Sequence, residues 1–345
     1  MASTDDQIDR DVVPPGRDWR ADWAGAIRDG AELCERVRLP RSLAAEPGGL
    51  SVRVPRHYLS RITPGDAHDP LLLQVLPRKE EGETPLGFSS DPLSEAAAGS
   101  PPSLLWKYSG RSLIVATGRC GVHCRFCFRR HFPSTALPPD LAAFEAVLRR
   151  IAREKSIHEV ILSGGDPLTL GDDQLADWVK RLAGLAHLRR LRIHTRMPIV
   201  IPSRVTPGLV DLLHATRLVP IVVVHVNHPA EIDREVELAL ARLVDAGVPV
   251  LNQSVLLRDV NDDVDVLAEL YERLVDLRVM PYYLHQLDRV AGAAHFEVAE
   301  EEGCRLVESL RARLPGYAVP RYVREVPGAS SKVWLTHRHE DTEPR

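Results

Sequence analysis

Residues 118–130 read GRCGVHCRFCFRR and contain three cysteines, Cys120, Cys124 and Cys127, in a C-x3-C-x2-C spacing. Iron–sulfur clusters are held by cysteine thiolates, and a fully ligated [4Fe–4S] cluster takes four of them. Three thiolates in one short loop would hold three irons and leave the fourth iron open. An open iron can bind a small molecule directly, so the loop indicates chemistry at the metal rather than simple electron storage.

Other uses of these cysteines explain less of the pattern. Zinc would need four nitrogen or sulfur ligands, with His123 or His131 completing a Cys3His set, but a second C-x2-C or H-x3-H pair is absent. A redox pair of Cys124 and Cys127 would leave Cys120 without a role. A disulfide does not fit a chain with five cysteines in 345 residues and no sign of export. The spacing favours a cluster and leaves zinc as the alternative.

The composition is typical of a soluble enzyme with a substantial core, because 44% of the residues are hydrophobic and 27% are charged. A net charge of −4 argues against a nucleic-acid binder that depends on overall basicity. The N-terminus is polar and acidic, and the longest apolar stretch, 218–226, is too short to span a bilayer. We therefore expect a cytoplasmic protein without a nucleic-acid or membrane partner, in which Cys34 and Cys304 are ordinary core or surface residues.

Apolar, β-branched runs alternate with amphipathic segments after residue 105. The predicted strands lie at 112–116, 159–162, 190–193, 219–226, 248–251 and 279–284, and the predicted helices at 141–154, 173–185, 207–214, 231–246, 264–277 and 300–314. Strands that alternate with helices form right-handed βαβ units and a parallel sheet. Six units are too few for a closed eight-stranded barrel. The pattern predicts an α/β fold with an open, curved (β/α)6 sheet.

The two ends of the chain differ from this core. Residues 1–105 are predicted to form a mainly helical extension, with helical spacing over 18–38, short helices over 54–76 and a long loop over 77–103. The core spans 106–298. Residues 299–345 are predicted to supply a last helix and a short C-terminal segment.

Polar residues follow each predicted strand at the point where it ends. The clusters are 117–127, 163–166, 194–196, 225–228, 252–254 and 285–288. Active sites of parallel α/β barrels form at the C-terminal ends of the strands, where the loops meet. Loops are generally polar, so one such cluster would mean little. Six clusters on one edge predict an active site there.

A C-x3-C-x2-C loop after the first strand of such a sheet resembles the radical S-adenosylmethionine (SAM) superfamily, and Ser163-Gly164-Gly165-Asp166 resembles its second signature. Residues 127–132, 252–262 and 281–288 are similar to the lysine 2,3-aminomutase family. Residues 91–93 and 292–296 are most similar to the branch that supplies β-lysine for elongation factor P (EF-P). The resemblance covers about 52–332 and implies a partial (β/α)6 barrel of parallel strands.

The resemblance implies three cofactors: a [4Fe–4S] cluster, SAM and pyridoxal 5′-phosphate (PLP). It assigns the cluster to Cys120, Cys124 and Cys127, and SAM to Ser163, Gly164, Gly165, Asp166, Arg196, His225 and Gln253. It makes Lys332 the catalytic lysine that forms the PLP Schiff base. It places the PLP phosphate near Lys107, Tyr108 and Arg111, since a phosphate needs cationic and N–H donors. A basic strand edge and a solvated C-terminal lysine are the plain alternatives for these residues.

The resemblance also implies how a substrate would be held. Arg129 matches an arginine that grips a carboxylate, and Asp288 and Glu325 match acids that hold the far amino group of lysine. Surface salt bridges with Arg289 and Arg324 are the alternative for the two acids. Two acids favour a cationic substrate tail over the carboxylate of glutamate, because like charges would repel.

The implied activity is an isomerase that converts L-lysine into β-lysine. A radical from SAM would take a hydrogen from the β-carbon, and nitrogen would move from C2 to C3 while bound to PLP. The implied partners are a flavodoxin- or ferredoxin-type electron donor, EF-P with its lysine ligase, and a second copy of the chain in a homodimer. An aminomutase for another amino acid, such as glutamate, is the first rival. An iron–sulfur electron carrier and a zinc-stabilised interaction module are rivals from other classes.

Overall fold

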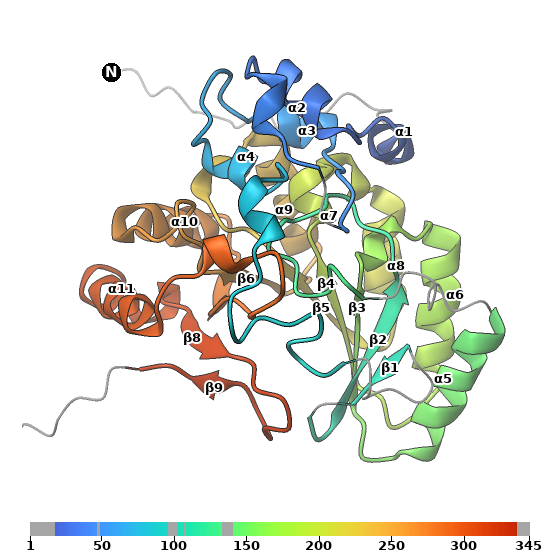
Figure 1. The fold of residues 1–345 in the computed structure, drawn as a ribbon. Coiled ribbons are helices and arrows are strands. Elements are labelled where there is room, and N and C mark those ends of the chain that lie inside the picture. The colour runs from blue at the N-terminus through green and yellow to red at the C-terminus, as the bar shows by residue number, and fades with distance from the viewer. Residues whose placement is uncertain (1–17, 47–48, 96–102, 107, 133–140, 337–345) are drawn as a thin grey trace, which may run out of the picture.

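The computed structural model describes residues 18–46, 49–95, 103–106, 108–132 and 141–336. Within these ranges lies a nine-stranded sheet in the order β1 to β9 (Figure 1). The strands are β1 (Leu104–Leu105), β2 (Arg111–Thr117), β3 (Glu159–Gly164), β4 (Arg190–Thr195), β5 (Val219–Val224), β6 (Val250–Val255), β7 (Met280–His285), β8 (Arg321–Arg324) and β9 (Val333–Trp334). Strands β2 to β8 are parallel, and β1 and β9 pair antiparallel at the two edges.

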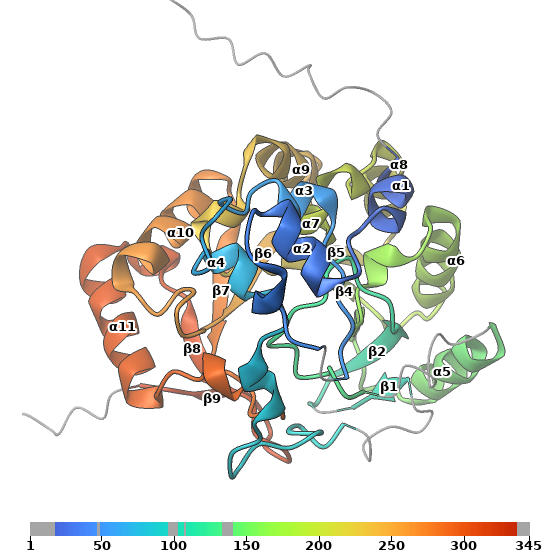
Figure 2. The ribbon, with the colours of Figure 1, turned by 45° about the horizontal axis from the view of Figure 1, so that its top comes forward.

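Six helices follow the parallel strands and form an arc around the sheet (Figure 2). They are α5 (Leu141–Arg153), α6 (Asp172–Ala183), α8 (Pro207–Ala215), α9 (Arg234–Asp245), α10 (Val264–Asp276) and α11 (Glu300–Arg313). Side chains fix the starts of three of them: Thr206 accepts from Leu209 N, Asp233 from Val236 N and Asp263 from Val266 N. The predicted α/β fold with a parallel, open (β/α) sheet is confirmed.

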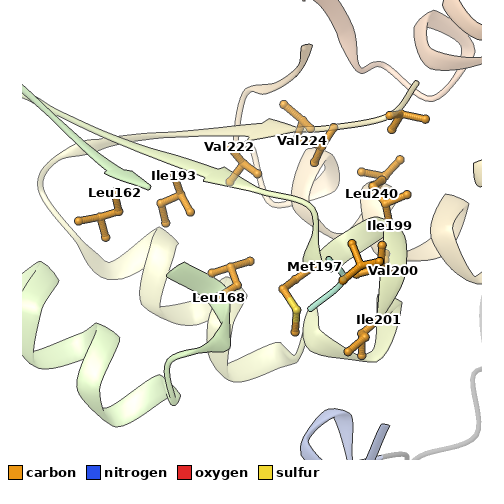
Figure 3. Packing of buried hydrophobic residues seen from close by; sticks show 14 of the residues in the cluster. Leu162, Leu168, Ile193, Met197, Ile199, Val200, Ile201, Val222, Val224 and Leu240 are labelled. Carbon is orange, nitrogen blue, oxygen red and sulfur yellow. The ribbon is translucent and has the colours of Figure 1, made fainter. Parts of the chain in front are cut away.

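The apolar core fills the space between the sheet and this arc. Figure 3 shows Leu162, Ile193 and Val222, from three neighbouring strands, on the same side as Leu168 and Met197. Each of these side chains is at least 98% buried. Burying an apolar side chain of this size stabilises the fold by about 1.5–3 kcal/mol. The side chains on the outer face of the sheet therefore form the core.

The opposite faces of the same strands carry polar side chains. On β4, Leu191, Ile193 and Thr195 are buried, whereas Arg192 and His194 alternate with them and are partly exposed. Successive side chains of a strand point to opposite faces of the sheet. The alternation therefore sends Arg192 and His194 to the inner, concave face, where the candidate site lies.

The N-terminal segment lies over the C-terminal ends of the strands. Its helices are α1 (Trp19–Ala24), α2 (Gly30–Arg36), α3 (Arg56–Leu59) and α4 (Pro70–Leu73), and α3 contacts α7 (Met197–Val200), the helix after β4. The Arg61 guanidinium donates to the backbone oxygen of Ile199 (2.7 Å). The segment is therefore part of the site's surroundings.

Two expectations about elements were incomplete. The helical spacing over 18–38 is split into α1 and α2, because Asp29 caps a new helix by accepting from Glu32 N (2.7 Å). Strands β1, β8 and β9 were missed, since two or four residues give too little pattern to detect. They lie outside residues 106–298, and the three-part division of the chain stays a prediction. In the described part of the chain, every helix is too short or too polar to cross a membrane.

Candidate active site

The inner face of the sheet and the strand-end loops enclose a cavity of about 350 Å3. Every residue predicted for the site and described by the structure lines it: Tyr108, Arg111, Cys120, Cys124, Cys127, Arg129, Ser163, Gly164, Gly165, Asp166, Arg196, His225, Gln253, Asp288, Glu325 and Lys332. Lys107 lies outside the described residues. The topology thus gathers side chains from distant parts of the chain into one place, and the role of each stays a prediction.

The cysteine loop is fixed by the N-terminal segment. The Trp23 indole N–H donates to the backbone oxygen of Cys120 (2.9 Å), and Arg125 N donates to the backbone oxygen of Gln74 (2.9 Å). The Arg125 side chain forms a two-pronged ion pair with Glu81 (2.7 and 2.5 Å), and both side chains are buried. Charge-assisted paired hydrogen bonds of this kind are strong and directional. These contacts therefore fix the backbone of the loop.

The three thiols of the loop line the cavity. Burial raises the pKa of Cys120 well above its ordinary value and the pKa of Cys127 to about 11, so both are protonated at neutral pH until a metal displaces the proton. Arg196 Nη1 donates to Cys124 Sγ (2.8 Å). Among the described side chains, no three metal-binding groups converge as a single ion requires. Iron–sulfur clusters are held by cysteine thiolates, and three thiols from one loop line this cavity, so the donor set fits a cluster.

The end of β3 packs directly against the cysteine loop. Gly164 has a φ of +112°, and a Cβ on Gly165 would lie 2.2 Å from the backbone oxygen of Arg119. The N–H groups of Gly165 and Asp166 donate to the backbone oxygens of Thr117 and Arg119 (2.6 and 2.7 Å). The close contact with the backbone of the cysteine loop therefore explains why glycine occupies both positions. The sequence alone did not predict this contact. Their approach to a ligand stays a prediction.

Asp166 joins the ends of β3 and β4. Its carboxylate accepts hydrogen bonds from Leu168 N (3.0 Å), Thr195 Oγ1 (2.7 Å), Arg196 N (2.6 Å) and Met197 N (3.1 Å). Burial raises the pKa of Asp166, and these donors oppose that shift. With four protein donors, the carboxylate chiefly orders the loops around the cavity.

Arg196 lies at the centre of a buried polar network beside Cys124. Its Nη2 donates to Gln74 Oε1 (2.6 Å) and Glu231 Oε2 (2.7 Å). Burial opposes ionisation of Glu231, but the ion pair with Arg196 keeps the net pKa of Glu231 below its ordinary value.

His225, which also lines the cavity, is stacked on Phe126 with 5.6 Å between ring centroids. Burial lowers the pKa of His225 to about 3, so this imidazole is neutral.

The other end of the cavity is built around Lys332. Its Nζ forms an ion pair with Glu325 and lies 5.8 Å from the Tyr283 ring centroid. The Arg111 guanidinium lies 5.0 Å from the Tyr108 ring, and its buried Nε has no hydrogen-bond partner in the described part of the chain. A primary amine near a cation and a phenol matches what PLP requires: an amine for the Schiff base and donors for the phosphate. The described residues therefore fit PLP.

Three inner-face side chains were not assigned from the sequence. Arg192, His194 and His285 line the cavity, and the Nε or Nε2 atom of each is buried with no partner among the described residues. Burial lowers the pKa of His285 to about 3 and that of His194 well below its ordinary value. The alternation along β4 could have predicted Arg192 and His194 for the inner face.

Arg129 has a partner that the sequence did not predict. Its Nε and Nη2 donate to the two carboxylate oxygens of Glu95 (2.7 and 2.9 Å). Glu95 belongs to the stretch 77–103, which has no periodic pattern and was expected to be a connecting loop. A buried ion pair between residues far apart in sequence leaves no local signal, so Glu95 was missed.

Comparison with known proteins agrees with this geometry. The model of the radical SAM superfamily matches residues 114–271. An L-lysine 2,3-aminomutase of Haemophilus influenzae is 42% identical, and the alignment covers 93% of this chain and 96% of that protein. An L-lysine 2,3-aminomutase of Escherichia coli K12 is also 42% identical, with 94% and 96% covered. The L-lysine 2,3-aminomutase of Clostridium subterminale is 36% identical, with 92% and 78% covered.

The three-cysteine loop, the parallel sheet and the superfamily match define a radical SAM enzyme, whose class uses a [4Fe–4S] cluster and SAM. Within that class, the chain belongs to the L-lysine 2,3-aminomutase family. It is therefore an isomerase, as the sequence predicted. Members of this family use PLP in addition to the cluster and SAM.

Proposed function

We propose that this protein is an L-lysine 2,3-aminomutase that produces β-lysine. The observation that carries the proposal is a single cavity that contains both the three thiols and Lys332, together with Arg129, Asp288 and Glu325. An electron carrier would need only the cysteines. When bound, the reduced cluster and SAM supply hydrogen-atom abstraction, and PLP supplies the carbonyl that links the migrating amino group.

Residues at the two ends of the cavity hold the cofactors in this proposal. Cys120, Cys124 and Cys127 bind the cluster, and Arg196 donates a hydrogen bond to Cys124 Sγ that orients this ligand. Lys332 supplies the amine for PLP, and Arg111 and Tyr108 stand beside it for the phosphate. Loops and strand ends line the cavity in which the reacting groups would meet.

The charges in the cavity favour an amino acid with a cationic tail. Arg129 is the carboxylate partner, and Asp288 and Glu325 are the ammonium partners. Glu325 also forms an ion pair with Lys332, so its carboxylate lies beside the amine proposed for PLP. The side-chain carboxylate of glutamate would meet two like charges at this end.

A role in the modification of EF-P is the finer part of the proposal. It is supported by residues 91–93 and 292–296, which are most similar to the branch that supplies β-lysine for EF-P. β-Lysine would then be passed to EF-P by a lysine ligase in the cytoplasm. A flavodoxin- or ferredoxin-type protein would reduce the cluster, and the chain would act as a homodimer.

Anaerobic turnover tests the substrate assignment. The protein reconstituted with iron and sulfide is incubated with SAM, PLP and dithionite, and with either L-lysine or L-glutamate. We expect β-lysine from L-lysine, identified by mass and by chiral chromatography, and no β-glutamate. Formation of β-glutamate alone, or SAM cleavage without an amino-acid product, would contradict the proposal.

A further inference from the structure

The Arg129–Glu95 pair is built into the wall of the cavity and is almost completely buried. The Arg129 side chain is 11% exposed and the Glu95 side chain 1% exposed. Both residues line the cavity, where the proposed function places the substrate carboxylate against Arg129. The Glu95 carboxylate thus contacts Arg129, the same arginine that is proposed to bind the carboxylate of the substrate.

The turn that carries Glu95 holds it in a defined position. Asp91 Oδ1 accepts a hydrogen bond from Glu95 N (2.9 Å), and the backbone oxygen of Asp91 accepts one from Ser94 N (3.3 Å). Ser94 has a φ of +54°, a left-handed conformation that is uncommon for a residue with a side chain. Leu93 is buried and anchors the turn. These contacts fix Glu95 in place, which favours a permanent partner over one that leaves when substrate binds.

Glu95 uses only one edge of the guanidinium. Its two oxygens take the Nε hydrogen and one Nη2 hydrogen of Arg129. An arginine has five N–H donors in a rigid plane, so three remain on the other edge. Nη1 donates long hydrogen bonds to Ser163 Oγ (3.3 Å) and to the backbone oxygen of Gly164 (3.4 Å), at the glycine loop after β3. A second carboxylate can bind at the outer edge in place of these two long bonds while Glu95 stays bound.

We propose that Glu95 is a positioning residue that holds Arg129 in one orientation, with its outer N–H edge presented to the carboxylate of the substrate. The inference rests on the proposed function, because it assumes an amino-acid substrate at Arg129. Glu95 supplies a fixed second carboxylate, so the long arginine side chain does not have to become ordered when substrate binds. Pre-ordering of this kind raises affinity by lowering the entropy lost on binding.

The test compares two ligands that differ only in the carboxylate. L-Lysine has it, and 1,5-diaminopentane has both amines without it. Binding of each is measured by anaerobic calorimetry on protein loaded with cluster and PLP, without reductant, so that no turnover occurs. In Glu95→Ala we expect the Kd for L-lysine to rise at least about tenfold and the Kd for 1,5-diaminopentane to change less than about twofold.

Two further variants serve as controls for this comparison. Glu95→Gln preserves the shape of the side chain and removes its charge, and we expect a smaller rise in the Kd for L-lysine; it replaces Glu95→Ala if that variant does not fold. Glu308→Ala removes the partner of the exposed Arg311 on α11 and should leave both constants unchanged.

Three results would overturn the positioning role: an unchanged Kd for L-lysine, tighter L-lysine binding, or equal losses for both ligands. Tighter binding would mean that Glu95 competes with the substrate, and equal losses would mean that it only stabilises the fold. Failure of the proposed function is distinguishable, because the wild-type protein would then bind no L-lysine.

Discussion

Lys332 is the residue on which the PLP assignment depends. It lies in a C-terminal stretch of small residues, where a lysine is ordinarily solvated, yet it faces the same cavity as the cysteines. Its ion pair with Glu325 and its position over Tyr283 hold the amine at the wall of that cavity. The sequence pattern could suggest Lys332 only through resemblance, whereas the fold explains how it reaches the site: β8 and β9 return it to the sheet edge next to β7.

Substitution of Lys332 by alanine should abolish covalent attachment of PLP. We expect borohydride reduction of the PLP-loaded wild type to leave a PLP adduct on the peptide that contains Lys332, since the amine is the Schiff-base donor. Lys332→Ala should incorporate at least about tenfold less PLP and lose turnover. Lys180→Ala, on the exposed face of α6, is the matched control. An adduct of equal yield in Lys332→Ala would show that another lysine carries PLP.

The elements around the site show what the sequence could and could not predict. The strands and helices from 111 to 314 were predictable, because apolar runs and amphipathic segments of their length give a clear local signal. The alternation on β4 would also have predicted Arg192 and His194 for the inner face, although they were not assigned. The positions of Glu81 and Glu95 were not predictable, since each pairs with arginines more than thirty residues away. The edge strands β1 and β9 were missed because two residues do not make a pattern.

Glu81 joins three elements around the cysteine loop. It accepts from Arg125 (2.7 and 2.5 Å) and from Arg130 Nη2 (2.5 Å), and Arg130 Nη1 donates to the backbone oxygen of Gly292 (2.6 Å). Removing one partner of a buried ion pair leaves an uncompensated charge and costs about 3–5 kcal/mol. We therefore expect Glu81→Gln to lower the free energy of unfolding by about 3 kcal/mol in urea. Glu297→Gln, at an exposed pair, should change it little.

The effect of Glu81 should depend on pH in a defined direction. Burial raises the pKa of Glu81, but the hydrogen bonds from Arg125 and Arg130 bring the net value below its ordinary one of 4.5. A carboxyl group whose pKa is lower in the folded state stabilises that state above its ordinary pKa, and loses this contribution as pH falls through the folded value. The difference between wild type and Glu81→Gln should be full at pH 7 and shrink below about pH 5. A difference that grows in acid would contradict the ion pair.

On the scale of the whole molecule, the sheet brings together parts of the chain that are far apart in sequence. The N-terminal helices lie over the strand ends, as Figures 1 and 2 show, and fix the cysteine loop through Trp23 and Arg125. The C-terminal strands supply Lys332 from the opposite edge of the sheet. The cavity between them is large enough for small ligands and polar enough to orient them. The central property of this cavity is that one end, the cluster end, contains Cys120, Cys124 and Cys127, and the other, the lysine end, contains Lys332.

Transfer of an isotope label tests this property most directly. L-Lysine that carries deuterium at C3 is incubated anaerobically with the reconstituted protein, SAM, PLP and dithionite, and the 5′-deoxyadenosine is analysed by mass spectrometry. If the cluster end and the lysine end share one cavity, deuterium will appear at the 5′-carbon of 5′-deoxyadenosine while β-lysine is formed. The shared cavity would be contradicted if SAM is cleaved in the presence of labelled L-lysine and the 5′-deoxyadenosine contains no deuterium.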